Sequence, residues 1–153
     1  MIERIISGGQ SGVDRAALDF AIACKIPHGG WCPRGRWAED GPVPESYRLK
    51  ETPDSAPAQR TEWNVRDSDA TLVLSIGPTL SGGSKQTVEF ALRHGKPCLH
   101  LSRRRDGKQA AAKLAAFLNE HGVKTLNVAG PRKSQEPEAE GFVRVVLEAV
   151  LVR

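Results

Sequence analysis

Residues 2–23 read IERIISGGQSGVDRAALDFAIA, and three patterns follow one another in this stretch. The apolar run at 2–6 predicts a short β-strand, and the glycine-rich residues 7–12 predict a turn that ends it. From residue 13 onward the apolar side chains recur at helical spacing, which predicts an α-helix over 13–23. The stretch is therefore a strand, a glycine loop and a helix in series.

The same alternation continues along the rest of the chain. ATLVLSI at 70–76 is a continuous apolar run, typical of a strand buried on both faces. Further strands are expected near 25–27 and at 97–101 and 124–128, helices at 59–67, 85–94, 109–121 and 137–150, and a polar loop at 103–108. Alternating strands and helices predict an α/β protein, a Rossmann-like three-layer fold with a mostly parallel sheet flanked by helices. The length of 153 residues fits one domain, 1–153.

Three glycine loops each follow an expected strand, at 7–12, 77–84 and 129–132. In a parallel sheet with right-handed crossovers, all strand-to-helix loops fall on one edge. Ligands of open α/β sheets bind at this carboxyl edge. The sequence therefore predicts one ligand site made by all three loops.

The first two loops have the composition of anion-binding turns at helix N-termini. Ligand contacts are expected from Gly8, Gly9, Gln10, Ser11 and Gly12 in the first loop, and from Gly82, Gly83, Ser84, Lys85, Thr87 and Glu89 in and after the second. The first loop resembles GxGxxG, but no acidic residue follows about 20 residues later, which argues against NAD. The second is not a P-loop, because Gly83 stands where the lysine is required.

The third loop contributes Gly130, which could admit close approach of a ligand, and Arg132, which could pair with a phosphate. The 25–58 stretch is rich in Gly, Pro and charge, and so long an irregular segment is often functional. We expect 29–45 to cover the ligand, with Trp31 and Trp37 stacking on a flat ring and Arg34 binding an anion. The alternative is that the tryptophans only anchor the loop to the core.

Composition excludes several other classes. Net charge is +4 with a pI near 9.2, and no basic stretch is interleaved with aromatics, so nucleic acid is not an expected partner. No apolar run approaches the roughly 20 residues of a membrane span, and no signal peptide is recognised, so the cytoplasm is expected. Three cysteines without a CxxC and four scattered histidines predict neither a disulfide framework nor a protein-bound metal.

Four motifs in series resemble one known family. SGGQSGVDRAALDFA, GWCPRGRWAEDG, SGGSKQTVEFA and NVAGPR are similar to those of the putative molybdenum-cofactor carriers, and the resemblance covers nearly the whole chain. That family belongs to a Rossmann-like, lysine-decarboxylase-like superfamily. The resemblance implies binding of the molybdenum cofactor, a phosphorylated pterin, or of a related nucleotide. It also implies a homo-oligomer, either a dimer or a tetramer.

The leading hypothesis is a binding or carrier protein for a phosphorylated pterin or nucleotide. A second hypothesis is a nucleoside-monophosphate phosphoribohydrolase, with Glu89 catalytic beside Arg34 or Lys85. The hydrolases of the superfamily carry PGGxGTxxE, from which Ser81, Lys85 and Gln86 depart here. A third is an oligomeric regulatory module that turns over no ligand.

Overall fold

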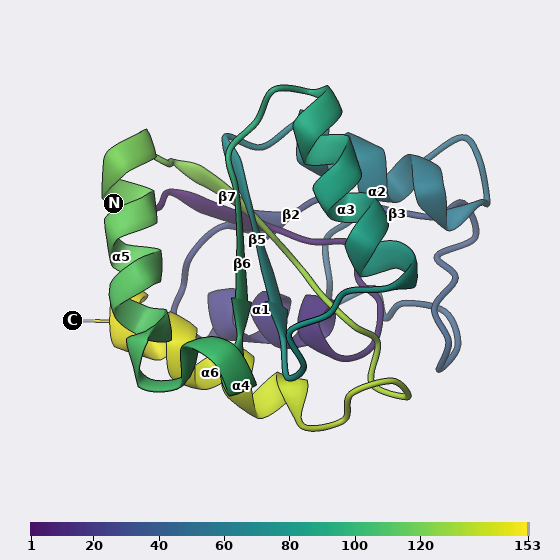
Figure 1. The fold of residues 1–153 in the computed structure, drawn as a ribbon. Helices are drawn as coiled ribbons and strands as arrows, with labels where there is room; N and C mark the ends of the chain where they lie inside the picture. The colour runs from purple at the N-terminus through teal and green to yellow at the C-terminus, as the bar shows by residue number, and fades with distance from the viewer. Residues whose placement is uncertain (153) are drawn as a thin grey trace.

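A computed structural model describes residues 1–152 of the chain, and its centre is a parallel β-sheet (Figure 1). The sheet has five strands in the order β2-β1-β7-β5-β6. Its strands are β1 (Arg4–Ile6), β2 (His28–Gly29), β5 (Ala70–Ser75), β6 (Cys98–Ser102) and β7 (Thr125–Ala129). Every pairing within it is parallel, as the alternation of strands and helices predicted.

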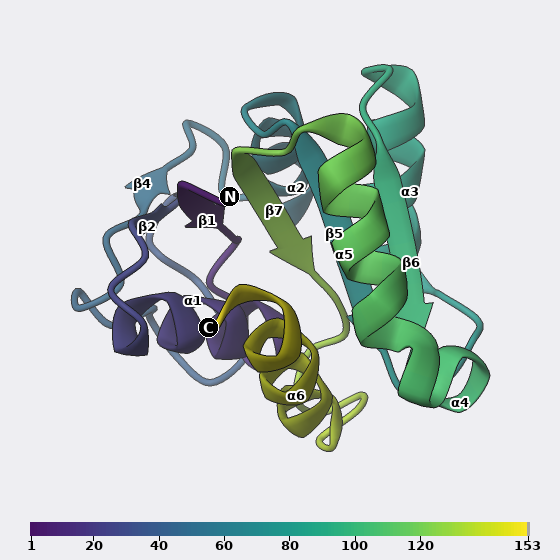
Figure 2. The same ribbon diagram turned by 90° about the vertical axis from the view of Figure 1, so that its left-hand side faces the viewer.

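Helices cover both faces of this sheet (Figure 2). One layer holds α1 (Val13–Ala23), α5 (Ala110–His121) and α6 (Ala139–Leu151), and the other holds α2 (Pro57–Arg66) and α3 (Gly82–Arg93). The largest apolar cluster joins the first layer to the sheet through side chains such as Phe20, Leu72 and Phe142. A smaller cluster of Val65, Phe90 and Ala91 lies under the second layer. The predicted three-layer α/β fold is confirmed.

The last strand of the chain lies in the middle of the sheet. β7 pairs with β1 on one side and with β5 on the other. If the β7–α6 unit is counted first, the strand order becomes 3-2-1-4-5, that of a doubly wound dinucleotide-binding sheet. The chain thus has the layout of that fold with its first unit moved to the end. The topological switch point lies between β7 and β5.

Several element boundaries differ from the sequence-based expectation. The short second strand is β2, just beyond the expected 25–27. The expected polar loop at 103–108 is wrong, because α4 (Arg103–Asp106) and a 3-10 helix (Gly107–Gln109) occupy it. The Ser102 hydroxyl caps α4 by accepting a hydrogen bond from Arg105 N, and Asp106 accepts one from Ser102 N at 2.8 Å. These local hydrogen bonds make a helical turn from a very polar sequence.

The 30–56 stretch contains a second, two-stranded parallel sheet, β3 (Trp31–Cys32) with β4 (Lys50–Glu51). Arg36 organises the rest of it by donating hydrogen bonds to four backbone carbonyls, those of Val43, Pro44, Tyr47 and Leu49. Apolar side chains of the stretch, among them Val43 and Leu49, pack with Leu18 of α1. The stretch is therefore an ordered layer beside α1.

Candidate functional site

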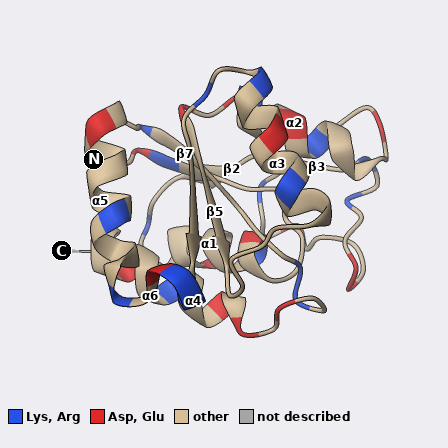
Figure 3. Cartoon of the chain, viewed as in Figure 1, with Lys and Arg blue, Asp and Glu red and all other residues tan. Residues whose placement is uncertain are grey.

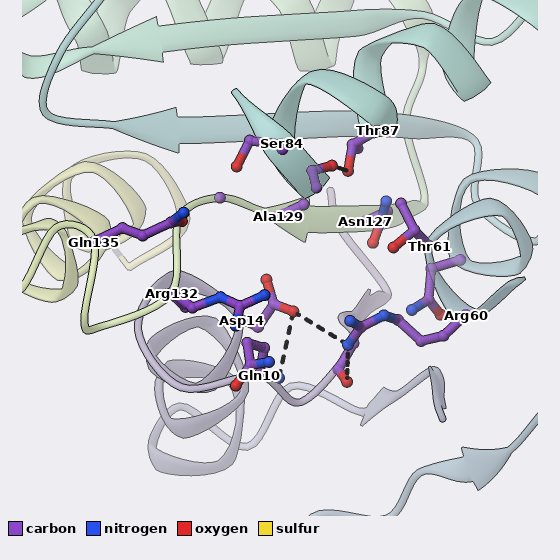
Figure 4. A pocket seen from close by; sticks show the side chains of 15 residues that line it. Gln10, Asp14, Arg60, Thr61, Ser84, Thr87, Asn127, Ala129, Arg132 and Gln135 are labelled. Carbon is purple, nitrogen blue, oxygen red and sulfur yellow. Dashed lines mark hydrogen bonds and ion pairs between the residues drawn. The ribbon is translucent and has the colours of Figure 1, made fainter. Parts of the chain in front are cut away.

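All three glycine loops reach one cavity of about 120 Å³ at the carboxyl edge of the sheet (Figure 4). It lies beside the β7 end, where the doubly wound fold places its ligands. Its lining residues are Gly8, Gln10, Asp14, Arg60, Thr61, Asn64, Gly82, Gly83, Ser84, Thr87, Asn127, Ala129, Gly130, Arg132 and Gln135. The convergence expected from the strand-to-helix alternation is present in the structure.

The glycines of the first and third loops make room for protein rather than for a ligand. A Cβ on Gly12 would lie 2.6 Å from Pro131 O, so the two loops pack backbone to backbone. A Cβ on Gly130 would lie 2.3 Å from Leu74 O, and one on Gly9 would lie 2.7 Å from a methyl group of Leu49. These positions fix the loops against each other and against the sheet.

The second loop differs, because its glycines face open space. A Cβ on Gly82 or Gly83 would meet no atom within 4 Å. Both lie in the first turn of α3, whose N-cap residue Ser81 makes no side-chain capping hydrogen bond. The first N–H groups of this helix therefore lack an intrahelical or a capping partner at the cavity wall. Such groups, with the positive end of the helix dipole, favour an anion.

Arg60 of α2 brings a buried positive charge to the same cavity. Its side chain is only 9% exposed. Nη1 donates a hydrogen bond to Gly8 O at 2.7 Å, whereas Nε is, within residues 1–152, a buried nitrogen with no hydrogen-bond partner. Burial lowers the pKa of the guanidinium, against the opposing effect of Asp14. A buried N–H without a partner costs free energy, so the structure has an unused donor here.

Asp14 lies across the cavity, in the first turn of α1. One of its carboxylate oxygens lies 3.9 Å from Arg60 Nη1 and 3.4 Å from Gln10 N. Burial raises the pKa of this carboxyl from its ordinary 3.8 to about 6, although Arg60 and the backbone N–H of Gln10 oppose the rise. The group is therefore about half protonated near pH 6 and mostly ionised at pH 7, and a pKa raised in this way is typical of functional carboxyls.

Arg132 and Gln135 reach the cavity from the loop between β7 and α6. Glu39 holds this loop in place, since Ser134 Oγ donates a hydrogen bond to it at 2.6 Å. The same carboxylate accepts a hydrogen bond from Ser11 Oγ at 2.6 Å, so it joins the first and third loops. Hydrogen bonds from both hydroxyls lower the pKa of Glu39.

The structure brings together eight of the residues expected from the sequence. Gly8, Gln10, Gly82, Gly83, Ser84, Thr87, Gly130 and Arg132 line the cavity. The other six, Gly9, Ser11, Gly12, Arg34, Lys85 and Glu89, are not among its lining residues. Because Glu89, Arg34 and Lys85 are all exposed and outside it, the catalytic pair of the hydrolase hypothesis is not assembled at this site.

Sequence reasoning missed seven lining residues: Asp14, Arg60, Thr61, Asn64, Asn127, Ala129 and Gln135. Asn127 and Ala129 could have been found, since they end the strand that leads into the third loop. Asp14 lies in the first turn of α1, where an acidic residue is common because it complements the helix dipole, so its position in the sequence did not indicate a site. Arg60, Thr61 and Asn64 lie on α2, which is not preceded by a glycine loop, so the loop pattern gave no signal for them.

None of the residues that line the cavity comes from the 29–45 segment, although Glu39 of this segment is bonded to the first and third loops beside it. Arg34 is exposed, and its N–H donates to Asp54 O. Trp31 packs edge-to-face on Trp63 and donates from Nε1 to Asp67, and Trp37 is 47% exposed. The cover over a bound ligand therefore stays a prediction, and the alternative, an anchoring role, fits Trp31.

Other polar groups have structural roles. The scattered histidines include one paired with a hydroxyl: His100 Nε2 lies 2.7 Å from Ser75 Oγ, a pairing that the sequence gave no sign of. That hydroxyl is buried and also donates to Gly77 O, so it does not present a nucleophile to solvent. Within residues 1–152 no group of three His, Cys, Asp or Glu side chains is placed to hold a metal. Nor is any helix of this range both long and apolar enough to cross a membrane.

The fold and the position of the cavity define this protein as a Rossmann-like α/β protein with a polar site at the switch point of its sheet. A family model matches residues 5–151, and the chain belongs to the circularly permutated YpsA SLOG family. The permutation agrees with the position of β7, the last strand, in the centre of the sheet.

One solved structure is similar over the whole chain. It is the putative molybdenum carrier protein from Syntrophus aciditrophicus SB, 49% identical, with a TM-score of 0.96, covering 99% of this chain and 96% of that one. The resemblance inferred from the four motifs is confirmed. Together with the family, this likeness supports a ligand-binding role.

Two other solved structures are much less similar. The E-1-hydroxy-2-methyl-but-2-enyl-4-diphosphate reductase from Plasmodium falciparum is 14% identical, with a TM-score of 0.39 over 95% of this chain and 52% of that one. An (E)-4-hydroxy-3-methyl-but-2-enyl diphosphate reductase is 10% identical, with a TM-score of 0.38 over 93% and 58%. Neither TM-score reaches 0.5, so nothing is inferred from them. No curated protein matches the chain.

Proposed function

We propose that this protein binds a small phosphorylated ligand, either the phosphorylated pterin of the molybdenum cofactor or a nucleotide, with the phosphate in the cavity at the carboxyl edge. The observation that carries the proposal is Arg60, a buried guanidinium that lines the cavity and whose Nε–H has no hydrogen-bond partner within residues 1–152. A phosphate in the cavity would accept hydrogen bonds from this guanidinium, and hydrogen bonds between guanidinium and phosphate are among the strong ones.

The charges around the cavity also favour an anion. Among the described residues, its charged lining side chains are Arg60, Arg132 and Asp14, which sum to one positive charge when the carboxyl is ionised. The first turn of α3 adds N–H donors and a partial positive charge opposite Arg60. Elsewhere basic and acidic residues are mostly interspersed, apart from the basic turn at α4 (Figure 3).

The size of the cavity suits one end of a ligand. Its volume of about 120 Å³ is well below the roughly 300–1,000 Å³ of pockets that bury a whole small molecule. The phosphate would therefore lie inside, with the pterin or base over the exposed rim near Gly83 and Gln135. Such a ligand is met in the cytoplasm, where we place the protein.

Calorimetry with molybdenum cofactor and with a panel of nucleoside monophosphates tests the proposal. We expect at least one of these ligands to bind, and Arg60→Met to weaken its binding about ten- to hundredfold, since a charge-assisted hydrogen bond is worth about 1.5–3 kcal/mol. Arg144→Met, on the exposed side of α6, is the matched control and should bind like the wild type. Absence of binding to every ligand, or equal affinities of the two variants, would overturn the proposal.

A further inference from the structure

A carboxyl group lines the cavity, although the other charged side chains there favour an anion. Asp14 is 7% exposed and faces the same space as Arg60 and Arg132. Two of its contacts within the protein are long, 3.4 Å to Gln10 N and 3.9 Å to Arg60 Nη1, against 2.7–3.2 Å for an ordinary N–H···O bond, and the backbone of Gly130 also interacts with it. The carboxyl is thus held in place without being fully satisfied.

An ionised carboxylate and a phosphate dianion repel each other at close range in a desolvated site. The repulsion disappears when one proton lies between the two oxygens, because one group then donates a hydrogen bond and the other accepts it. Bonds of this O–H···O⁻ type are short and strong. A buried carboxyl beside an anion therefore selects anions with which it can share a proton.

We propose, on the basis of the function proposed above, that Asp14 makes this a proton-coupled phosphate site: the bound phosphate monoester and the Asp14 carboxyl share one proton. When both partners are ionised in solution, that proton comes from the solvent on binding. The proton donor is hydronium or the buffer acid, whose bond to hydrogen breaks as the O–H bond at the site forms, and no other bond changes. The site therefore favours phosphate over oxyanions that are poor proton acceptors, such as sulfate and molybdate.

The surroundings of Asp14 are compatible with the shared proton. The charged groups that face it are Arg60 from α2, Arg15 from its own helix and Arg132 from the loop after β7. Arg15 is engaged elsewhere, with Asp40 at 2.6 Å and Gly9 O at 2.9 Å. Burial nevertheless outweighs these cations and raises the pKa of Asp14 to about 6, close to the second pKa of a phosphate monoester, about 6.

This arrangement reverses the usual pH dependence of an anion site. A purely cationic site binds phosphate more tightly as the pH rises and phosphate gains its second charge. Here, both Asp14 and phosphate lose the proton that they must share. We expect affinity for a phosphate monoester such as methyl phosphate to fall between pH 6.5 and pH 8.5, approaching about tenfold per pH unit at the upper end.

Calorimetry with methyl phosphate, a phosphate monoester that carries no proton of its own as the dianion, and with sulfate and molybdate on the full chain tests the inference. Runs at pH 8 in two buffers of different ionisation enthalpy count the protons taken up. We expect about one proton per phosphate bound, and a preference for phosphate over sulfate and molybdate of about ten- to hundredfold at pH 7, the value of one charge-assisted hydrogen bond.

Asp14→Asn removes the shared proton and leaves an amide of the same shape. In this variant we expect no proton uptake at pH 8, phosphate and sulfate affinities within about threefold, and phosphate affinity that rises with pH. The control is Asp19→Asn, on the exposed side of the same helix, which should keep the wild-type pattern.

Phosphate binding without proton uptake, or with the same selectivity in Asp14→Asn, would overturn the inference while leaving the proposed function intact. Absence of phosphate binding together with absence of binding to every cofactor and nucleotide would overturn both.

Discussion

The carboxyl group of Asp14 reduces the stability of the fold at neutral pH, whereas the proposed phosphate site needs it for binding. Its pKa of about 6 in the folded protein lies above its ordinary value of 3.8, so folding favours the protonated form. The resulting stabilisation is fully present below about pH 4 and is lost as the pH rises through 6. At neutral pH the ionised carboxylate therefore reduces the stability of the fold.

Asp14→Asn should accordingly raise the free energy of unfolding at pH 8 by about 2–3 kcal/mol, since each pKa unit corresponds to about 1.4 kcal/mol. The gain should shrink as the pH falls from 7 to 4. Urea unfolding of both proteins at a series of pH values measures it. Asp19→Asn, on the exposed side of α1, should show no such pH-dependent gain. A constant difference between Asp14→Asn and wild type across this range would contradict the raised pKa.

Arg132 is the second cation of the site, and it lies in a loop rather than on a helix. Arg132→Ala should weaken binding of a phosphorylated ligand about ten- to hundredfold and reduce the salt dependence of the affinity. Arg104→Ala, on the exposed surface of α4, is the control, and both are measured at two salt concentrations. Equal affinities of the two variants would mean that Arg60 and the α3 N-terminus hold the phosphate without Arg132.

At the scale of elements, the glycine at the start of α3 lies in open space, whereas the glycine after the end of β7 is closely packed. Gly83 lies in the first turn of α3, where a Cβ meets no atom within 4 Å. Gly83→Ala should therefore stabilise the fold by about 0.5–1 kcal/mol, as is usual for Gly to Ala within a helix. The same methyl group would occupy space expected for the phosphate, so binding of inorganic phosphate should weaken severalfold. Urea unfolding and calorimetry on one preparation test both effects.

Gly130→Ala is the opposite case, because its Cβ would lie 2.3 Å from the Leu74 carbonyl on the neighbouring strand. We expect a loss of about 1–3 kcal/mol of stability, the usual effect of overpacking. Thermal unfolding of this variant beside Gly83→Ala gives the comparison. A larger loss of stability for Gly83→Ala than for Gly130→Ala would contradict both the open space at Gly83 and the close packing at Gly130.

At the scale of the whole molecule, we expect this chain to form an oligomer. The resemblance to the carrier family implies a dimer or a tetramer, and apolar side chains such as Leu92 and Val145 are 83% and 66% exposed on α3 and α6. Light scattering should therefore give two or four times the 16.6 kDa chain mass. A mass of one chain over the concentration range used for calorimetry would contradict this expectation.

Local sequence determined the elements and the edge of the sheet that carries the site. Apolar runs such as 70–76 and helical spacing such as 13–23 depend only on neighbouring residues, and right-handed crossovers place every strand-to-helix loop on one edge. Gly83 and Arg132 could be predicted as site residues for that reason. The family could also be predicted, because its motifs are local stretches of sequence.

Only the tertiary structure decided which groups meet inside the cavity. Arg60 reaches it from α2, 52 residues from the Gly8 carbonyl that it contacts, and nothing in a helical pattern shows that a guanidinium will be buried and left with a free N–H. Glu89 and Arg34 satisfied the sequence pattern but lie outside, because the direction of a side chain is set by packing between layers. The raised pKa of Asp14 has the same origin: desolvation depends on what surrounds a carboxyl in space, and those atoms come from parts of the chain far apart in the sequence.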